Sequence, residues 1–131
     1  MENKITIYNK TEKIEVALEK VEFKNVTAPK DFDGYYSRHH GLSLIVTGHC
    51  GDDTVNALSR ARDAKDNIYN VKINGEYINS AKCSDIEYTF TYDDMELFEF
   101  NYSFDTILGF TFTLVLKGHK YIWQFFKQAC L

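Results

Sequence analysis

Apolar and polar residues alternate along most of the chain, with the two-residue period that is typical of β-strands. The alternation begins with Ile5 and Ile7, passes through a polar segment over residues 9–12 and resumes at Ile14 and Val16. Two alternating segments that flank a short polar turn predict a β-hairpin at the start of the chain.

Two segments fit either a strand or a helix. Residues 12–24 hold apolar side chains at both spacings, and the preceding alternation favours a strand. Residues 119–130 present the same choice, because Tyr121, Trp123 and Phe125 predict a last strand while the apolar residues that follow them fit a helical face. Both interpretations stay open for both segments.

One segment predicts a helix. Three residues with short polar side chains, Asp52, Asp53 and Thr54, are N-cap candidates directly before a run of helical spacing. The pattern predicts a helix over about residues 54–66 with a narrow, alanine-rich apolar face. We expect a helix of this kind to lie against a sheet rather than to run through a core.

The second half of the chain is predicted to be β-structure nearly throughout. Strands are expected at 86–92, 98–104 and 110–116, where large apolar residues alternate with polar ones. The pair Asn74–Gly75 is a strong signal for a two-residue hairpin turn. A second tight turn is predicted at Asp93–Asp94, so that the first two of these strands would form a hairpin.

The fold class expected from these elements is α+β. A chain of 131 residues with a single proline fits one compact domain over residues 1–131. We expect a mostly antiparallel β meander, a curled sheet or a barrel-like sandwich, with one main α-helix. Aromatic residues are more numerous than one short helix can cover. Either the sheet curls, or the surplus apolar surface meets another subunit, a partner or a ligand.

The formal charge of −4 has its origin in one segment. Residues 85–105 hold seven acidic side chains and no lysine or arginine. In the predicted hairpin, like charges would face one another and destabilise it by up to about 1 kcal/mol per pair. The simplest explanation is a charged strand that resists aggregation. A surface for a basic partner is the second, and a divalent cation bound by Asp93, Asp94 and Glu96 is the third.

The residues predicted to bind a basic partner share this segment. They are the exposed acids of the hairpin and two tyrosines as anchors: Glu87, Tyr92, Asp93, Asp94, Glu96, Glu99 and Tyr102.

Other candidate chemistry is sparse. Cys50 follows His49 directly and precedes the predicted helix, whose N-terminus can lower a thiol pKa. Adjacent strand residues point to opposite sides, however, so His49 is not expected to contact the Cys50 sulfur. No metal-ligand spacing is present, and we assign no catalytic residue, metal or cofactor. Acidic residues lie among the basic ones of the predicted helix, so direct nucleic-acid binding is not expected.

Three functional hypotheses follow. The first is a cytoplasmic, non-enzymatic protein-binding module, such as an inhibitor or immunity-type protein whose acidic hairpin binds a toxin, a nuclease or a nucleic-acid-binding protein. The second is a self-assembling structural subunit of a ring or tube, by architectural analogy with phage tails or secretion apparatus. The third is a small enzyme that uses Cys50 and a histidine. The sequence holds no membrane-length apolar run, and we expect no cleavable leader and a cytoplasmic location.

Overall fold

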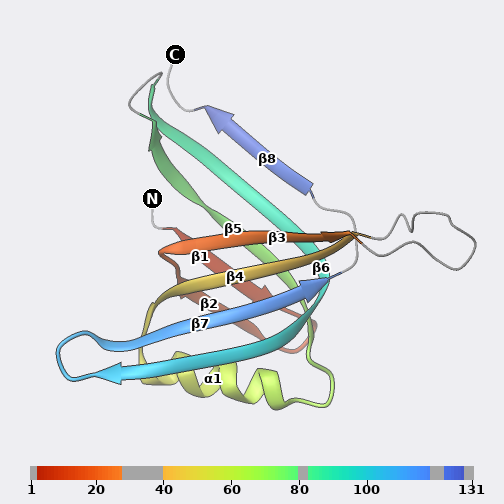
Figure 1. The fold of residues 1–131 in the computed structure, drawn as a ribbon, viewed down its shortest axis with the longest axis vertical. Coiled ribbons are helices and arrows are strands. Elements are labelled where there is room, and N and C mark those ends of the chain that lie inside the picture. The colour runs from red at the N-terminus through yellow and green to blue at the C-terminus, as the bar shows by residue number, and fades with distance from the viewer. Residues whose placement is uncertain (1–2, 28–39, 80–82, 119–122, 129–131) are drawn as a thin grey trace, which may run out of the picture.

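The computed structural model describes residues 3–27, 40–79, 83–118 and 123–128, which are drawn in colour in Figure 1. The elements in chain order are β1 (Lys4–Tyr8), β2 (Lys13–Ala17), β3 (Lys20–Thr27), β4 (His40–Cys50), α1 (Asp52–Asp63), β5 (Ile68–Asn79), β6 (Cys83–Asp105), β7 (Gly109–Gly118) and β8 (Trp123–Gln128). The strands pair antiparallel in the order β2-β1-β5-β6-β7-β4-β3, and β8 pairs with β6. This confirms the predicted α+β class.

The long strand β6 makes the sheet curl. Its first half pairs with β5 and β8, whereas its second half pairs with β7. Figure 1 shows β6 changing direction between these halves, which folds β7, β4 and β3 back over β5. Phe23 of β3 consequently meets Phe90 of β6 edge to face, with the ring centroids 5.3 Å apart. The predicted curled sheet is confirmed, and its strands surround the core.

The core takes alternate residues from strands on both sides of the curl. Most of its side chains are apolar residues of β1, β2, β4, β5, β6 and β7: Ile5, Ile7, Ile14, Val16, Leu42, Leu44, Val46, Tyr69, Val71, Ile73, Tyr92, Met95, Leu97, Phe100, Phe112, Leu114 and Leu116. The helix α1 adds Val55, Leu58 and Ala61 and packs against β6 and β2. The narrow apolar face of α1 therefore covers one side of the sheet, as its sequence predicted.

The helix begins and ends slightly earlier than predicted. Gly51 occupies the N-cap position with extended backbone, and no side chain caps the helix there. Asp52 and Asp53 lie in the first turn instead, where their charges favour the positive end of the helix dipole. No helix in the described part of the chain is long and apolar enough to cross a membrane.

The predicted hairpin turn at Asn74–Gly75 is wrong, because β5 continues through both residues. Gly75 serves a close approach and not a turn: a Cβ atom there would collide with the Asn3 side chain. The Asn3 Oδ1 atom accepts hydrogen bonds from the Glu76 amide at 3.0 Å and from the Tyr88 hydroxyl at 2.6 Å. A tertiary contact therefore overrides the local turn preference.

We expect Gly75→Ala to lower the free energy of unfolding by about 1–3 kcal/mol, since the added methyl group must displace Asn3. Gly51→Ser is the matched control, because no atom lies within 4 Å of a Cβ built there and serine is a good N-cap residue. Urea unfolding of the two variants measures the difference. Equal stability of both variants would contradict the role given to Gly75.

The predicted turn at Asp93–Asp94 is also wrong, since β6 is one continuous strand through this pair. Asp94 has a positive φ of 53°, and the pairing with β5 slips by one residue between Tyr92 and Met95. A second slip lies between Leu97 and Glu99, in the pairing with β7. Such bulges bend a strand and shift which residues face inward. The hairpin on which the acidic-surface hypothesis was built therefore does not form.

The two ambiguous segments are strands where the structure describes them. Residues 13–17 and 20–27 form β2 and β3, and residues 123–128 form β8. The helical alternatives are therefore wrong for these residues, whereas Tyr121 and the end of the chain lie outside the described residues.

Candidate functional site

The hairpin formed by β6 and β7 extends past the end of β4 by one residue pair and the connecting turn. The neighbouring strand β4 ends at Cys50, which lies opposite Phe110. Pairing between β6 and β7 continues past this point to Asp105 and Gly109. In Figure 1 the connecting turn is the leftmost part of the molecule. We call residues 102–110 the ribbon, and residues 105–109 within it the tip.

Aromatic rings run from the core onto the ribbon. Phe100 is buried, and its ring centroid lies 5.5 Å from that of Tyr102. The Phe110 ring follows, 6.0 Å from Tyr102 and 5.0 Å from Phe104. Tyr102 and Phe104 are each more than half exposed. The aromatic stripe of the core thus continues into solvent without a covering layer in the described structure.

The tip is an ordered turn that presents two aliphatic side chains. The Asp105 Oδ1 atom accepts hydrogen bonds from the Ile107 amide at 2.7 Å and the Leu108 amide at 3.0 Å, which lowers the pKa of Asp105. Gly109 has a φ of 78°, a conformation that favours glycine. Ile107 is 90% exposed and Leu108 64% exposed. The chain therefore fixes the turn by hydrogen bonds and leaves its largest apolar groups in water.

This arrangement is chemically suited to binding a protein surface. Large apolar groups on a rigid support lose little conformational entropy when they are buried. Exposed apolar surface that continues over several residues is typical of protein–protein contact sites. The ribbon is therefore the candidate functional site.

A second apolar surface lies between β3 and the pair formed by β5 and β6. It is a groove of about 270 Å³ whose lining is mainly aromatic and aliphatic: Asn3, Leu18, Glu19, Lys20, Val21, Phe23, Ile73, Glu76, Tyr77, Tyr88 and Phe90. Phe23 and Tyr77 are both partly exposed at its rim. Burial raises the pKa of Tyr88, whose hydroxyl is fixed on Asn3. We call this surface the apolar groove.

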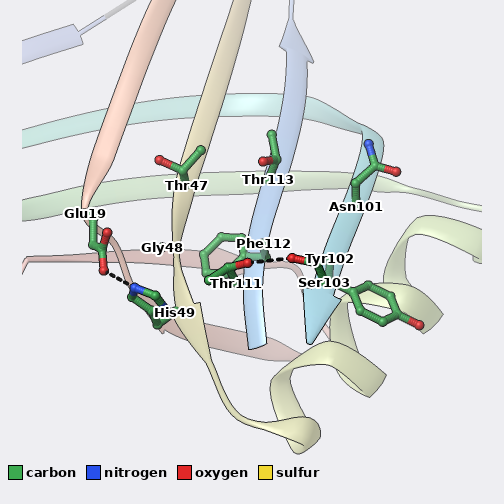
Figure 2. A pocket seen from close by; sticks show the side chains of 10 residues that line it. All are labelled: Glu19, Thr47, Gly48, His49, Asn101, Tyr102, Ser103, Thr111, Phe112 and Thr113. Carbon is green, nitrogen blue, oxygen red and sulfur yellow. Dashed lines mark hydrogen bonds and ion pairs between the residues drawn. The ribbon is translucent and has the colours of Figure 1, made fainter. Parts of the chain in front are cut away.

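The outer face of β4, β7 and the end of β6 holds a shallow polar cavity, shown in Figure 2. His49 points toward Glu19 there, with Nε2 2.8 Å from the Glu19 Oε1 atom. Thr111 and Ser103 share a hydrogen bond of 2.8 Å between their hydroxyl oxygens. The cavity has a volume of about 370 Å³ and is lined by several hydroxyl side chains of the sheet. The histidine in its lining, His49, already contacts the Glu19 carboxylate.

The side chains of His49 and Cys50, the two catalytic candidates from the sequence, lie on opposite faces of β4 in the structure. His49 faces the polar cavity, whereas Cys50, the next residue of β4, packs against the core. Burial raises the pKa of the Cys50 thiol, although α1 begins only two residues later. A raised pKa lowers the thiolate fraction at neutral pH, which is the opposite of nucleophile activation. The arrangement does not support the Cys50 enzyme hypothesis.

We therefore expect Cys50 to react with iodoacetamide more slowly than a free cysteine at pH 7–8, and to accelerate only above its ordinary pKa of about 8.5. A variant with Cys83→Ser and Cys130→Ser isolates the signal of this thiol. Mass spectrometry of the alkylated protein over a pH series gives the rates. Fast alkylation near pH 7 would contradict the unactivated thiol.

The predicted acidic residues do not form two facing strands. Tyr92 is only 3% exposed and belongs to the core, so it cannot anchor a partner. Asp93, Asp94 and Glu96 are exposed around the bend of β6. Within the described residues, no group of three or more histidine, cysteine or acidic side chains is placed to hold a metal ion.

The remaining predicted residues have other cross-strand neighbours than expected. Glu87 lies opposite Glu76 of β5 and Lys127 of β8, while Glu99 lies opposite Val115 of β7. Tyr102 is the one predicted anchor that is exposed on the ribbon. The sequence pattern does not single out the tip as a site, although two aliphatic residues, Ile107 and Leu108, interrupt the polar turn between two aromatic strands.

Comparison with known proteins identifies the fold. No protein-family model matches the chain, and no curated protein matches it. A solved structure of an Hcp protein is similar over 97% of this chain and 98% of its own, with a TM-score of 0.60 and 10% identity. The Hcp1 protein from the E. coli EAEC 042 pathovar is similar over 95% and 97%, with a TM-score of 0.54 and 11% identity. A chain from the virion of a native gene transfer agent particle matches with a TM-score of 0.49 and 11% identity over 95% of both chains. The chain is thus similar in fold to Hcp proteins along nearly its whole length.

Proposed function

We propose that this chain is a self-assembling structural subunit, which binds further copies of itself to form a ring or tube. The observation that carries the proposal is the tip, where Asp105 orders a turn that leaves Ile107 and Leu108 in solvent. Apolar groups that contribute little to the core, held in one conformation, are typical anchors of a protein interface. Tyr102 and Phe104 of the same ribbon add further exposed apolar side chains.

The charged residues on the edge strands indicate that copies do not associate by pairing one edge strand with another. Strand β2 presents Lys13 and Glu15, and β3 presents Lys20, Glu22 and Lys24. Charged residues on edge strands disfavour pairing with another strand. The apolar ribbon has no such charges apart from Asp105. Contact between copies is therefore expected at the ribbon.

We expect a ring or tube because the chain has two different apolar surfaces, the ribbon and the apolar groove. The ribbon lies at the end of β6, and the apolar groove takes Tyr88 and Phe90 from its beginning. A contact between unlike surfaces leaves one of each free on every added copy, so that it repeats until a ring closes or a tube grows. A symmetric dimer would instead need one surface that is complementary to itself.

Binding of a basic partner through the acidic residues of β6 stays a prediction, as does a cytoplasmic location. The acids remain exposed around Asp93, Asp94 and Glu96. The hairpin that would have gathered them is absent, and one of the two predicted anchors is buried. The exposed apolar side chains of the ribbon therefore support self-assembly more strongly than the acidic residues support binding of a basic partner.

Light scattering at two concentrations, about 10 µM and about 500 µM, tests the proposal by mass action. We expect the weight-average mass to rise well above 15.2 kDa at the higher concentration. A mass that stays at that of the single chain at both concentrations would contradict self-assembly.

A further inference from the structure

We infer that the tip of one copy inserts Ile107 and Leu108 into the apolar groove of the next copy. This inference rests on the proposed self-assembly and names the two surfaces that meet. The tip is the most exposed apolar element of the described structure, and the groove is a concave apolar surface elsewhere on the same chain.

The two surfaces match in chemistry. The rings of Phe23, Tyr77, Tyr88 and Phe90 wall the groove, with Ile73 also in the lining. A cavity of about 270 Å³ provides room for a pair of branched aliphatic side chains. Removing these groups and the surrounding rings from water supplies the main driving force for association.

Both surfaces are already formed before contact. On one side the Asp105 carboxylate holds the tip through two backbone hydrogen bonds. On the other, the edge-to-face contact of Phe23 with Phe90 and the bond from Tyr88 to Asn3 fix the groove walls. Little conformational entropy is lost when two ordered surfaces meet, so that more of the buried area contributes to affinity.

The charges around the contact are also compatible. Asp105 is the single charged residue of the segment 101–111, and Lys20 contributes a positive charge to the groove. Glu19 and Glu76, the carboxylates of the same lining, both have partners within their own chain. Lys20 pairs with Glu22 in an exposed contact at 3.0 Å, and contacts of this kind contribute little energy. Lys20 is thus available to face Asp105 of a neighbouring copy.

A single copy cannot make this contact with itself. Tyr88 and Phe90 lie in the first half of β6, whereas the tip begins at its last residue, Asp105. The pairing of β7 with both β6 and β4 holds the ribbon in place. The groove must therefore receive the tip of another copy, and the contact is head to tail.

Mixing two variants tests the inference. The tip variant carries Ile107→Asp and Leu108→Asp, and the groove variant carries Phe23→Asp and Tyr77→Asp. The changed side chains are all partly or largely exposed, and thermal unfolding verifies that both variants fold. Ile78→Asp controls for a new aspartate beside the groove, since Ile78 neighbours Tyr77 and is 77% exposed but does not line the groove. Sedimentation velocity measures the size of each species.

We expect each variant alone to be a monomer, with its dissociation constant for self-association raised about 100-fold or more. A mixture of both should form a one-to-one dimer and nothing larger, because just one intact tip and one intact groove remain in it. The Ile78→Asp control should assemble like the native chain. If the groove variant assembles like the native chain while the tip variant does not, the tip docks elsewhere, which overturns this inference but not self-assembly. A native chain that stays monomeric overturns both.

Discussion

Leu97→Ala is expected to lower the free energy of unfolding by about 2–5 kcal/mol, whereas Phe98→Ala, one residue further along β6, should cost about 1 kcal/mol or less. Leu97 is completely buried, so that its truncation leaves a cavity in the core. Phe98 is 50% exposed, and its ring contacts the Lys117 Nζ atom, which lies 3.5 Å from the ring centroid. Urea unfolding followed by circular dichroism measures both variants.

The two variants test the bulged register of β6 directly. Strict alternation from Phe100 back through Phe98 would place Phe98 in the core and Leu97 in solvent. The slip between Leu97 and Glu99 reverses this assignment. A larger loss of stability in Phe98→Ala than in Leu97→Ala would contradict the register of the structure.

The tip variant, with Ile107→Asp and Leu108→Asp, is expected to lose self-assembly while its unfolding midpoint changes little. Both native side chains are mostly in solvent, so that they contribute little to the core. In an interface, each aspartate would bring a charge into an apolar groove, which is strongly unfavourable without a partner for it. Sedimentation velocity and thermal unfolding on the same samples separate the two effects.

The matched control for this variant is Asn56→Asp with Arg60→Gln on the exposed face of α1. It lowers the formal charge by two, as the tip variant does, but leaves the ribbon unchanged. We expect it to assemble like the native chain. If both variants lose assembly equally, general charge repulsion rather than the tip would be responsible.

The spacing of apolar residues correctly predicted those strands and the helix that keep the same face on the core along their whole length. Strands β1 and β2 follow from the alternation around Ile5 and Ile14, and α1 follows from its helical spacing. Each has one face on the core from end to end, so that the period of the apolar residues in the sequence matches the residues that enter the core.

The wrong turns have a shared physical cause. Asn74–Gly75 and Asp93–Asp94 have the composition of tight turns, and the chain uses both for other purposes. Gly75 makes room for Asn3, a residue more than seventy positions away, and Asp94 takes its positive φ at a bulge. Such contacts depend on tertiary structure, which composition within a short window does not contain.

The candidate site was partly visible in the sequence. The surplus of aromatic residues predicted either a curled sheet or a surface for another subunit, and the structure combines a curl with exposed aromatic residues on the ribbon. The position of that surface depends on the β5–β6 pairing ending at Glu96, and on β4 ending at Cys50, one residue pair before the β6–β7 pairing ends. The relative lengths of strands distant in sequence decide this, and no pattern within β6 reveals it.

Electron microscopy of the purified native chain, at the higher of the two light-scattering concentrations, tests self-assembly most directly. The predicted result is a field of closed rings or short tubes, in which the β6–β7 tip of each copy rests on its neighbour. Single particles of one chain, or symmetric pairs that join tip to tip, would contradict the head-to-tail subunit proposed for this protein.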